Sequence, residues 1–131
     1  MAKAIHAMFR VLDEARAVDF YEKAFGLAVE DRIDFDEFTL IYMRNAEADF
    51  EVELTVNKGR TEPYDLGDGY GHLAVVVDDV DRENARLTDL GYSPRNVAEL
   101  KRDGAPFARC LCVPDPDGYK IEVLQKGGRF Q

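Results

Sequence analysis

The chain has 131 residues, a formal net charge of −9 at pH 7 and a hydrophobic content of 46%. A chain of this length forms one compact unit or two mutually dependent modules, because a half of about 65 residues can hardly bury a stable core alone. The acidic balance argues against nucleic acid and against an anionic membrane surface as partners. No apolar run reaches the roughly 18 residues of a membrane-spanning helix. The N-terminus also lacks a long apolar core, so we expect no signal peptide and a cytoplasmic location.

The first half predicts a strand, a helix and three further strands. Residues 5–11 are mostly apolar and form the first predicted strand, with His6 near its start. Asp13 is a suitable N-cap for the helix that follows. Apolar residues recur there at helical spacing until Gly26, which suits the end of a helix. Further strands are expected at residues 27–33, 38–43 and 50–56.

The second half repeats this plan. Residues 71–77 form a predicted strand rich in valine, with His72 at its start. Asp81 is expected to cap a helix that Gly91 closes. The turn at residues 115–118 combines proline and glycine at favourable positions and would set the register of the strand that follows it. The strands on either side of this turn are expected at residues 107–113 and 119–124.

The repeat predicts two β-α-β-β-β modules, at residues 1–66 and 67–131, that together make one structural unit. Residues 60–70 are rich in glycine, proline, aspartate and tyrosine and are expected to link the modules. In the second half, Cys110 and Cys112 lie two residues apart in a predicted strand. This spacing is poor for a disulfide, so we expect reduced thiols.

Each module carries one histidine at its start and one glutamate late in an apolar stretch, and the chain contains only two histidines. The first pair is His6 and Glu53, and the second is His72 and Glu122, at matching positions of the repeat. Two imidazoles and two carboxylates suit a divalent nickel, cobalt, iron, manganese or zinc ion. Water would fill the remaining positions and keep the site open and Lewis-acidic. A displaced carboxylate could then remove a carbon-bound proton.

Taken singly, these residues also have structural interpretations. His6 could be an ordinary histidine at the end of a strand. Glu53 shares a strand face with Glu51, and Glu122 shares one with Lys120, so either glutamate could lie on a solvated edge. The metal hypothesis depends on the joint placement of all four candidate ligands at equivalent positions.

Five segments in order resemble glyoxalase I (lactoylglutathione lyase) of the vicinal-oxygen-chelate superfamily, in its compact bacterial form. The resemblance covers nearly the whole chain, and the ordered set is much more specific than any one segment. The segments are residues 6–11 (HAMFRV), 19–23 (DFYEK) with Gly26 and Leu27, 53–59 (ELTVNKG), 70–74 (YGHLA) and 115–122 (DPDGYKIE).

The resemblance implies an α+β fold in which the two modules form a curved mixed sheet. It also implies conversion of the methylglyoxal–glutathione hemithioacetal to S-lactoylglutathione, by proton transfer through an enediolate. Glu122, or Glu53 on the opposite face, would move the proton, and Arg10 and Asn57 would bind glutathione. The implied metal ligands are His6, Glu53, His72 and Glu122.

In that family the site forms between two chains of a homodimer, with His6 and Glu53 from one chain and His72 and Glu122 from the other. One divalent ion is expected per site. Nickel or cobalt is favoured for compact members, and zinc is possible. The small-molecule hemithioacetal is the expected partner.

Two segments depart from the family pattern. The linker at residues 67–70 has an acid where some relatives carry an arginine for glutathione, and residues 100–107 are also unusual. Lys101, Arg102 or Arg109 is therefore a candidate for the positive contact, although Lys101 and Arg102 also suit a solvated loop.

Three other functions of the superfamily remain as alternatives. A metal-free drug-binding protein typically lacks the complete ligand set. An acyl-CoA epimerase usually has glutamine in place of Glu53. A ring-cleaving dioxygenase uses two histidines and one carboxylate, so the fourth candidate ligand disfavours it.

Overall fold

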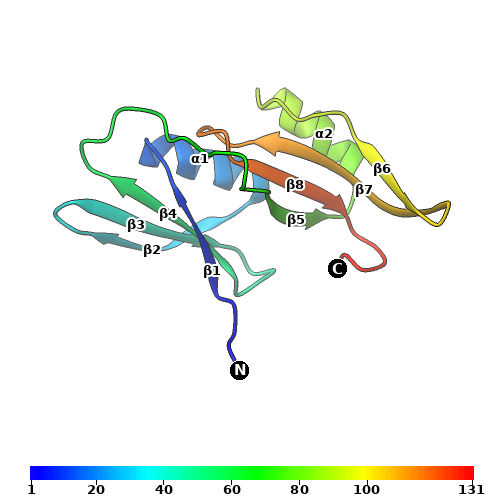
Figure 1. Cartoon of the computed structure of the whole chain (residues 1–131), viewed down its shortest axis with the longest axis horizontal. Coiled ribbons are helices and arrows are strands. Elements are labelled where there is room, and N and C mark those ends of the chain that lie inside the picture. The colour runs from blue at the N-terminus through cyan, green and yellow to red at the C-terminus, as the bar shows by residue number, and fades with distance from the viewer. The chain divides into compact units, whose positions relative to one another are not determined.

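The computed structural model describes all of the chain, Met1–Gln131, and divides it into two compact units, Met1–Asp65 and Leu66–Gln131. Each unit follows the order strand, helix and three strands (Figure 1), which confirms the expected α+β class. The first unit contains β1 (His6–Arg10), α1 (Glu14–Phe25), β2 (Ala28–Asp34), β3 (Phe38–Arg44) and β4 (Glu51–Asn57). The second contains β5 (Leu73–Val77), α2 (Val80–Asp89), β6 (Ala98–Arg102), β7 (Ala105–Pro114) and β8 (Lys120–Gln125).

Each unit forms its own four-stranded mixed sheet, and the two sheets have the same topology. The strand orders are β1-β4-β3-β2 and β5-β8-β7-β6. In each unit the first strand runs parallel to the last, and the other pairs are antiparallel. This register places Met8 opposite Glu53 and Ala74 opposite Glu122. His6 lies two positions before Met8, and His72 lies two positions before Ala74. Because side chains alternate between faces along a strand, each histidine shares a sheet face with the glutamate of its unit.

The helix-covered face of each sheet is apolar. In the first unit, Ile41, Met43 and Leu54 are fully buried, and so is the apolar side of α1. Arg32 lies opposite Ile41 and reaches Glu14 of α1 at 2.6 Å, which identifies this face as the one next to the helix. The alternating burial of β3 leaves the other face partly open. The histidine and glutamate of this unit lie on the open face.

The ends of α1 form as the sequence predicts. Asp13 has an extended backbone, and its Oδ1 accepts a hydrogen bond from the backbone N–H of Arg16 at 2.7 Å. Gly26 ends the helix with a φ of 65°, a left-handed conformation that glycine adopts without a Cβ penalty. Both ends depend on contacts within a few residues, which explains why the sequence alone located them.

The expected cap of α2 is wrong by two residues. Asp79 is the N-cap, and its Oδ1 accepts from the backbone N–H of Arg82 at 3.0 Å. Asp81 lies in the first turn instead, where its negative charge interacts favourably with the positive end of the helix dipole. Gln125 of β8 accepts a hydrogen bond from the Val80 N–H at 2.9 Å and so helps to set the helix start. This contact joins residues far apart in the chain.

Two strands also differ from the sequence prediction. β5 begins at Leu73, so His72 lies just before the strand rather than inside it. The suggested loop at Lys101 and Arg102 is wrong, because both residues belong to β6. The turn after them has positive φ values at Asp103 and Gly104, as in a tight hairpin. All five residues of β6 are exposed, so this strand has no buried face, although Ala98 and Leu100 alternate with Glu99 and Lys101.

No helix of the chain is long and apolar enough to cross a membrane.

Candidate metal centre

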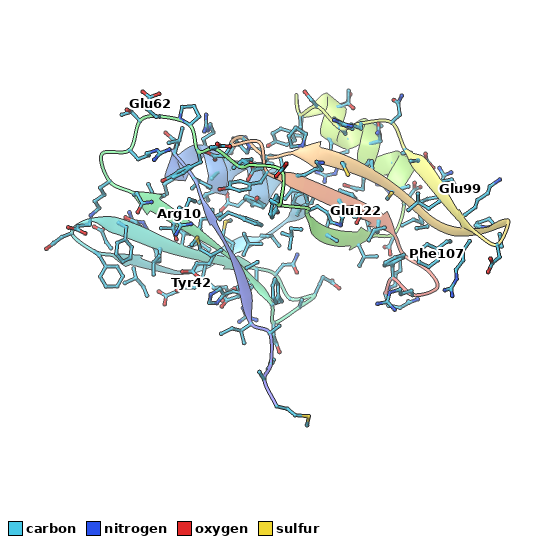
Figure 2. All side chains as sticks on the ribbon, viewed as in Figure 1. Arg10, Tyr42, Glu62, Glu99, Phe107 and Glu122 are labelled. Atoms are coloured by element: carbon cyan, nitrogen blue, oxygen red, sulfur yellow. The ribbon has the colours of Figure 1, made fainter.

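The first unit brings His6 and Glu53 together on the open face of its sheet. Nε2 of His6 lies 2.8 Å from Oε2 of Glu53. Tyr42 lies opposite Glu53 across β3 and β4, and its hydroxyl donates a hydrogen bond to Oε1 of Glu53 at 3.1 Å. Both oxygens of this carboxylate therefore have a neighbour within the unit. Figure 2 labels Tyr42 beside β1 and β3.

Glu53 is only 8% exposed, so the solvated-edge interpretation is wrong for this residue. A buried carboxylate is costly without partners, and His6 and Tyr42 supply them. Its neighbour Glu51 is more exposed and lies 3.8 Å from the guanidinium of Arg44. The two glutamates share a face, but they have different surroundings.

The second unit repeats the histidine–glutamate pair with the same geometry. Nε2 of His72 lies 2.8 Å from Oε2 of Glu122. The residue opposite Glu122 is Cys112, where the first unit has Tyr42 opposite its glutamate. The Glu122 side chain is 17% exposed, compared with 10% for that of Glu53. The adjacent Lys120 is exposed, so the two residues of this face differ in burial as well.

Burial and negative charge act on the polar groups around both glutamates. Burial, followed by the hydrogen bond to Glu53 and the charge of Glu53, raises the pKa of the Tyr42 hydroxyl. Burial and then the charge of Glu122 raise the pKa of both Cys110 and Cys112. These groups therefore keep their protons at neutral pH. Both cysteines are free, as the sequence predicts.

The two residues expected to bind glutathione lie on the open face of the first unit. Arg10 is exposed on β1, and Thr55 lies opposite it. Figure 2 shows the labelled Arg10 on this strand. Asn57 ends β4 on the same face, and its Nδ2 donates to the hydroxyl of Tyr64 at 3.0 Å. The guanidinium of Arg60 stacks over the Tyr64 ring at 4.2 Å, so an aromatic and a second cation adjoin Asn57.

Arg109 does not suit the expected contact with the thiol cosubstrate. It alternates with Cys110 along β7 and lies on the face that α2 covers. There it pairs with Asp81 at 2.6 Å and with Glu99 at 3.7 Å. This guanidinium lies on the face away from Glu122, so its placement does not support the suggested contact, which stays a prediction.

The donor atoms present in each unit fit part of a divalent metal site. The 2.8 Å between imidazole nitrogen and carboxylate oxygen in each pair is close to the spacing of adjacent ligands that each lie about 2.0–2.2 Å from one ion. Each pair supplies two protein donors, and the chain contains no cluster of three or more His, Cys, Asp or Glu side chains placed to hold a metal.

Sequence reasoning missed Tyr42 and Tyr64. The alternation of side chains along β3 indicates the face on which Tyr42 lies. Only the pairing of β3 with β4 places Tyr42 opposite Glu53. Tyr64 lies outside the regular elements, and its contact with Asn57 carries no sequence signal.

Comparisons with known proteins agree with this fold over nearly the whole chain. The chain is 37% identical over 128 residues to a lactoylglutathione lyase of Neisseria meningitidis serogroup A, covering 95% of the chain and 91% of the relative. It is 34% identical over 130 residues to a probable lactoylglutathione lyase of Synechocystis, covering 95% of the chain and 96% of the relative.

Solved structures give the same result. Glyoxalase I from Zea mays matches with a TM-score of 0.84 and 30% identity, covering 96% of this chain but only 45% of the maize chain. The trypanothione-dependent glyoxalase I of Leishmania major matches with a TM-score of 0.77 and 31% identity, covering 95% of this chain and 87% of that one. Residues 3–123 match a single family model, so the chain belongs to the Glyoxalase/Bleomycin resistance protein/Dioxygenase superfamily.

Proposed function

We propose that this chain is a metal-dependent glyoxalase I that isomerises the hemithioacetal of methylglyoxal and glutathione to S-lactoylglutathione. The observation that carries the proposal is the pair of matching half-sites, each with its histidine and glutamate 2.8 Å apart. The relatives named lactoylglutathione lyase, at 31–37% identity over most of the chain, support an enzyme of this type. The fold alone would not, because one fold supports many activities.

The proposed ligands are His6 and Glu53 from one half-site and His72 and Glu122 from the other. Nitrogen and oxygen donors of this kind accept nickel, cobalt or zinc, and nickel or cobalt is our expectation. When bound, the ion acts as a Lewis acid for the two oxygens of the substrate.

The carboxylates move the proton in this proposal. Glu122 takes the proton from the carbon that carries sulfur, which breaks the C–H bond, and delivers the same proton to the adjacent carbon. The hydroxyl proton on the carbon that carries sulfur moves to the oxygen of the adjacent carbon. No oxidant or reductant is needed, because the reaction only relocates hydrogen within the substrate. Glu53 would serve a substrate bound on the opposite face. Arg10 and Asn57 hold the glutathione part through charge and amide hydrogen bonds.

We further propose that the complete site forms in a homodimer, with His6 and Glu53 from one chain and His72 and Glu122 from its partner. Apolar side chains on the faces that carry these residues support an interface there. Met8 lies opposite Glu53 and is 37% exposed, and Val76 of β5 is 40% exposed. Burying such faces between chains would be favourable.

The other functions considered from the sequence are not favoured. Both half-sites keep both donor residues, unlike a metal-free binding protein. Glu53 stands where the epimerases usually have glutamine. The named relatives are lactoylglutathione lyases.

The direct test is turnover of the methylglyoxal–glutathione hemithioacetal by protein stripped of metal and then loaded with nickel, cobalt or zinc in turn. We expect S-lactoylglutathione to form with at least one ion and not with the stripped protein. The control is the double variant His6→Ala, His72→Ala treated in the same way. Absence of product with all three ions, in protein shown to contain them, would contradict the proposed function.

A further inference from the structure

The two half-sites match in their histidine–glutamate pairs but differ at the residue opposite each glutamate. Tyr42 lies opposite Glu53, whereas Cys112 lies opposite Glu122. Both residues lie on a strand antiparallel to the one that carries the glutamate, so they occupy equivalent places in the repeat. The two half-sites are therefore unequal.

Tyr42 restrains the carboxylate of Glu53 through the oxygen that is not beside His6. Its hydroxyl donates to Oε1 at 3.1 Å, while His6 Nε2 lies 2.8 Å from Oε2. The Tyr42 ring also meets the His6 ring edge-on, with 6.0 Å between centroids and 68° between planes. One aromatic side chain thus contacts both candidate ligands of the first half-site. With both oxygens engaged, rotation of this carboxylate would break a hydrogen bond.

Glu122 has a weaker restraint. Its Oε2 lies beside His72, and its carboxylate has a hydrogen bond with the thiol of Cys110, which lies two positions along β7 from the facing Cys112. A thiol is a weak hydrogen-bond donor compared with a phenol. The Glu122 side chain is also more exposed than that of Glu53, at 17% against 10%.

We propose that Tyr42 is a positioning residue that holds the carboxylate of Glu53 in place for metal binding, a stronger restraint than the thiol of Cys110 gives Glu122 in the second half-site. Groups that orient a ligand from outside are general features of metal sites. The proposal rests on metal binding at the proposed site and not on proton transfer.

The test measures nickel affinity by competition with a chromogenic chelator, with no substrate present. Tyr42→Phe removes only the hydroxyl, and we expect it to weaken nickel binding by about tenfold, as is typical for loss of an orienting partner. Cys110→Ala is the matched control in the other half-site and should change the affinity by less than about threefold, because it removes only a weak thiol donor to Glu122. Equal affinities for wild type and Tyr42→Phe would overturn the proposal.

A double-mutant cycle separates positioning from a general loss of stability. In a Glu53→Gln background, Tyr42→Phe should have little further effect on nickel affinity, because the charged acceptor is already gone. In a Glu122→Gln background the full tenfold effect should remain. The same effect in both backgrounds would show that Tyr42 does not act through Glu53 and would reject the proposal.

Nitrogen NMR of the two imidazoles in metal-free protein gives a second readout that needs neither metal nor activity. The chain has only two histidines, one in each half-site. Tyr42→Phe should shift the His6 ring signals and leave those of His72 in place. Unshifted His6 signals would contradict the proposal. If the cycle and NMR hold but wild type turns over no hemithioacetal, the proposed function fails and the role of Tyr42 stands.

Discussion

His72 and Glu122 lie with Nε2 and Oε2 2.8 Å apart, although one residue precedes β5 and the other lies within β8. The parallel pairing of these strands sets Ala74 opposite Glu122, and the imidazole reaches the carboxylate from two residues earlier. Because the first unit has the same offset, the repeat produces two pairs of potential ligands with one geometry.

Replacement of Glu122 tests the assignment of the base. Glu122→Gln keeps the size and one oxygen of the side chain but cannot take a proton. We expect turnover of the hemithioacetal by metal-loaded protein to fall by at least about 10²-fold, the contribution of a general base. Nickel retention should fall less than in His72→Ala, which loses a ligand outright. Glu53→Gln should reduce turnover less. Near-normal turnover by Glu122→Gln with metal bound would exclude it as the base.

Mixing two inactive variants tests whether the site is shared between chains. His6→Ala damages one half-site and His72→Ala the other, so we expect either variant alone to be inactive. If the chains exchange and each site combines half-sites from two chains, every mixed dimer carries one intact site and one doubly damaged site. Equal mixing should then restore about a quarter of the wild-type activity in a twofold dimer.

Failure of the mixture to regain activity would contradict the shared site. If each site used only residues of one chain, no mixture could contain an intact site. Sedimentation velocity of the variants and the mixture should show a dimer throughout. An active wild-type monomer at micromolar concentration would contradict the shared site but leave the chemistry unaffected.

The cysteines should react slowly in the folded, metal-free protein. Burial and the charge of Glu122 raise the pKa of Cys110 and Cys112, so less thiolate is present at pH 8 than in the unfolded chain. Because the thiolate is the reactive form, alkylation by iodoacetamide should be slower than in denaturant and should accelerate with rising pH. Mass spectrometry of the labelled peptides gives the rates. Equal rates in folded and denatured protein would contradict these shifts.

Asp115 should contribute strongly to the stability of the turn before β8. Asp115 is only 4% exposed. Its Oδ1 accepts hydrogen bonds from the backbone N–H groups of Asp117 and Tyr119, each at 2.9 Å. Asp115→Ala leaves both donors without this acceptor and should lower the free energy of unfolding by about 1–3 kcal/mol. Urea unfolding measures the change. Asp36→Ala, at an exposed turn position, is the control and should be close to neutral.

Local interactions explain why several elements could be predicted from the sequence. Asp13 caps the start of α1 and Gly26 ends it, each through hydrogen bonds with residues of the same helix. The turn at residues 115–118 closes through hydrogen bonds between its own residues. The recurrence of histidine and glutamate also predicted which residues would meet, and the structure brings each pair together. Their role as metal ligands stays a prediction.

Tertiary pairing decided the remaining features. β6 forms because its backbone pairs with β7, although none of its side chains is buried. The start of α2 is fixed in part by the hydrogen bond from the Val80 N–H to the side chain of Gln125 in β8. Tyr42 reaches Glu53 because two strands pair in one particular register. A strand sequence indicates which residues share a face, but the residue across the ladder is determined by long-range hydrogen bonding and packing, so only the folded chain reveals it.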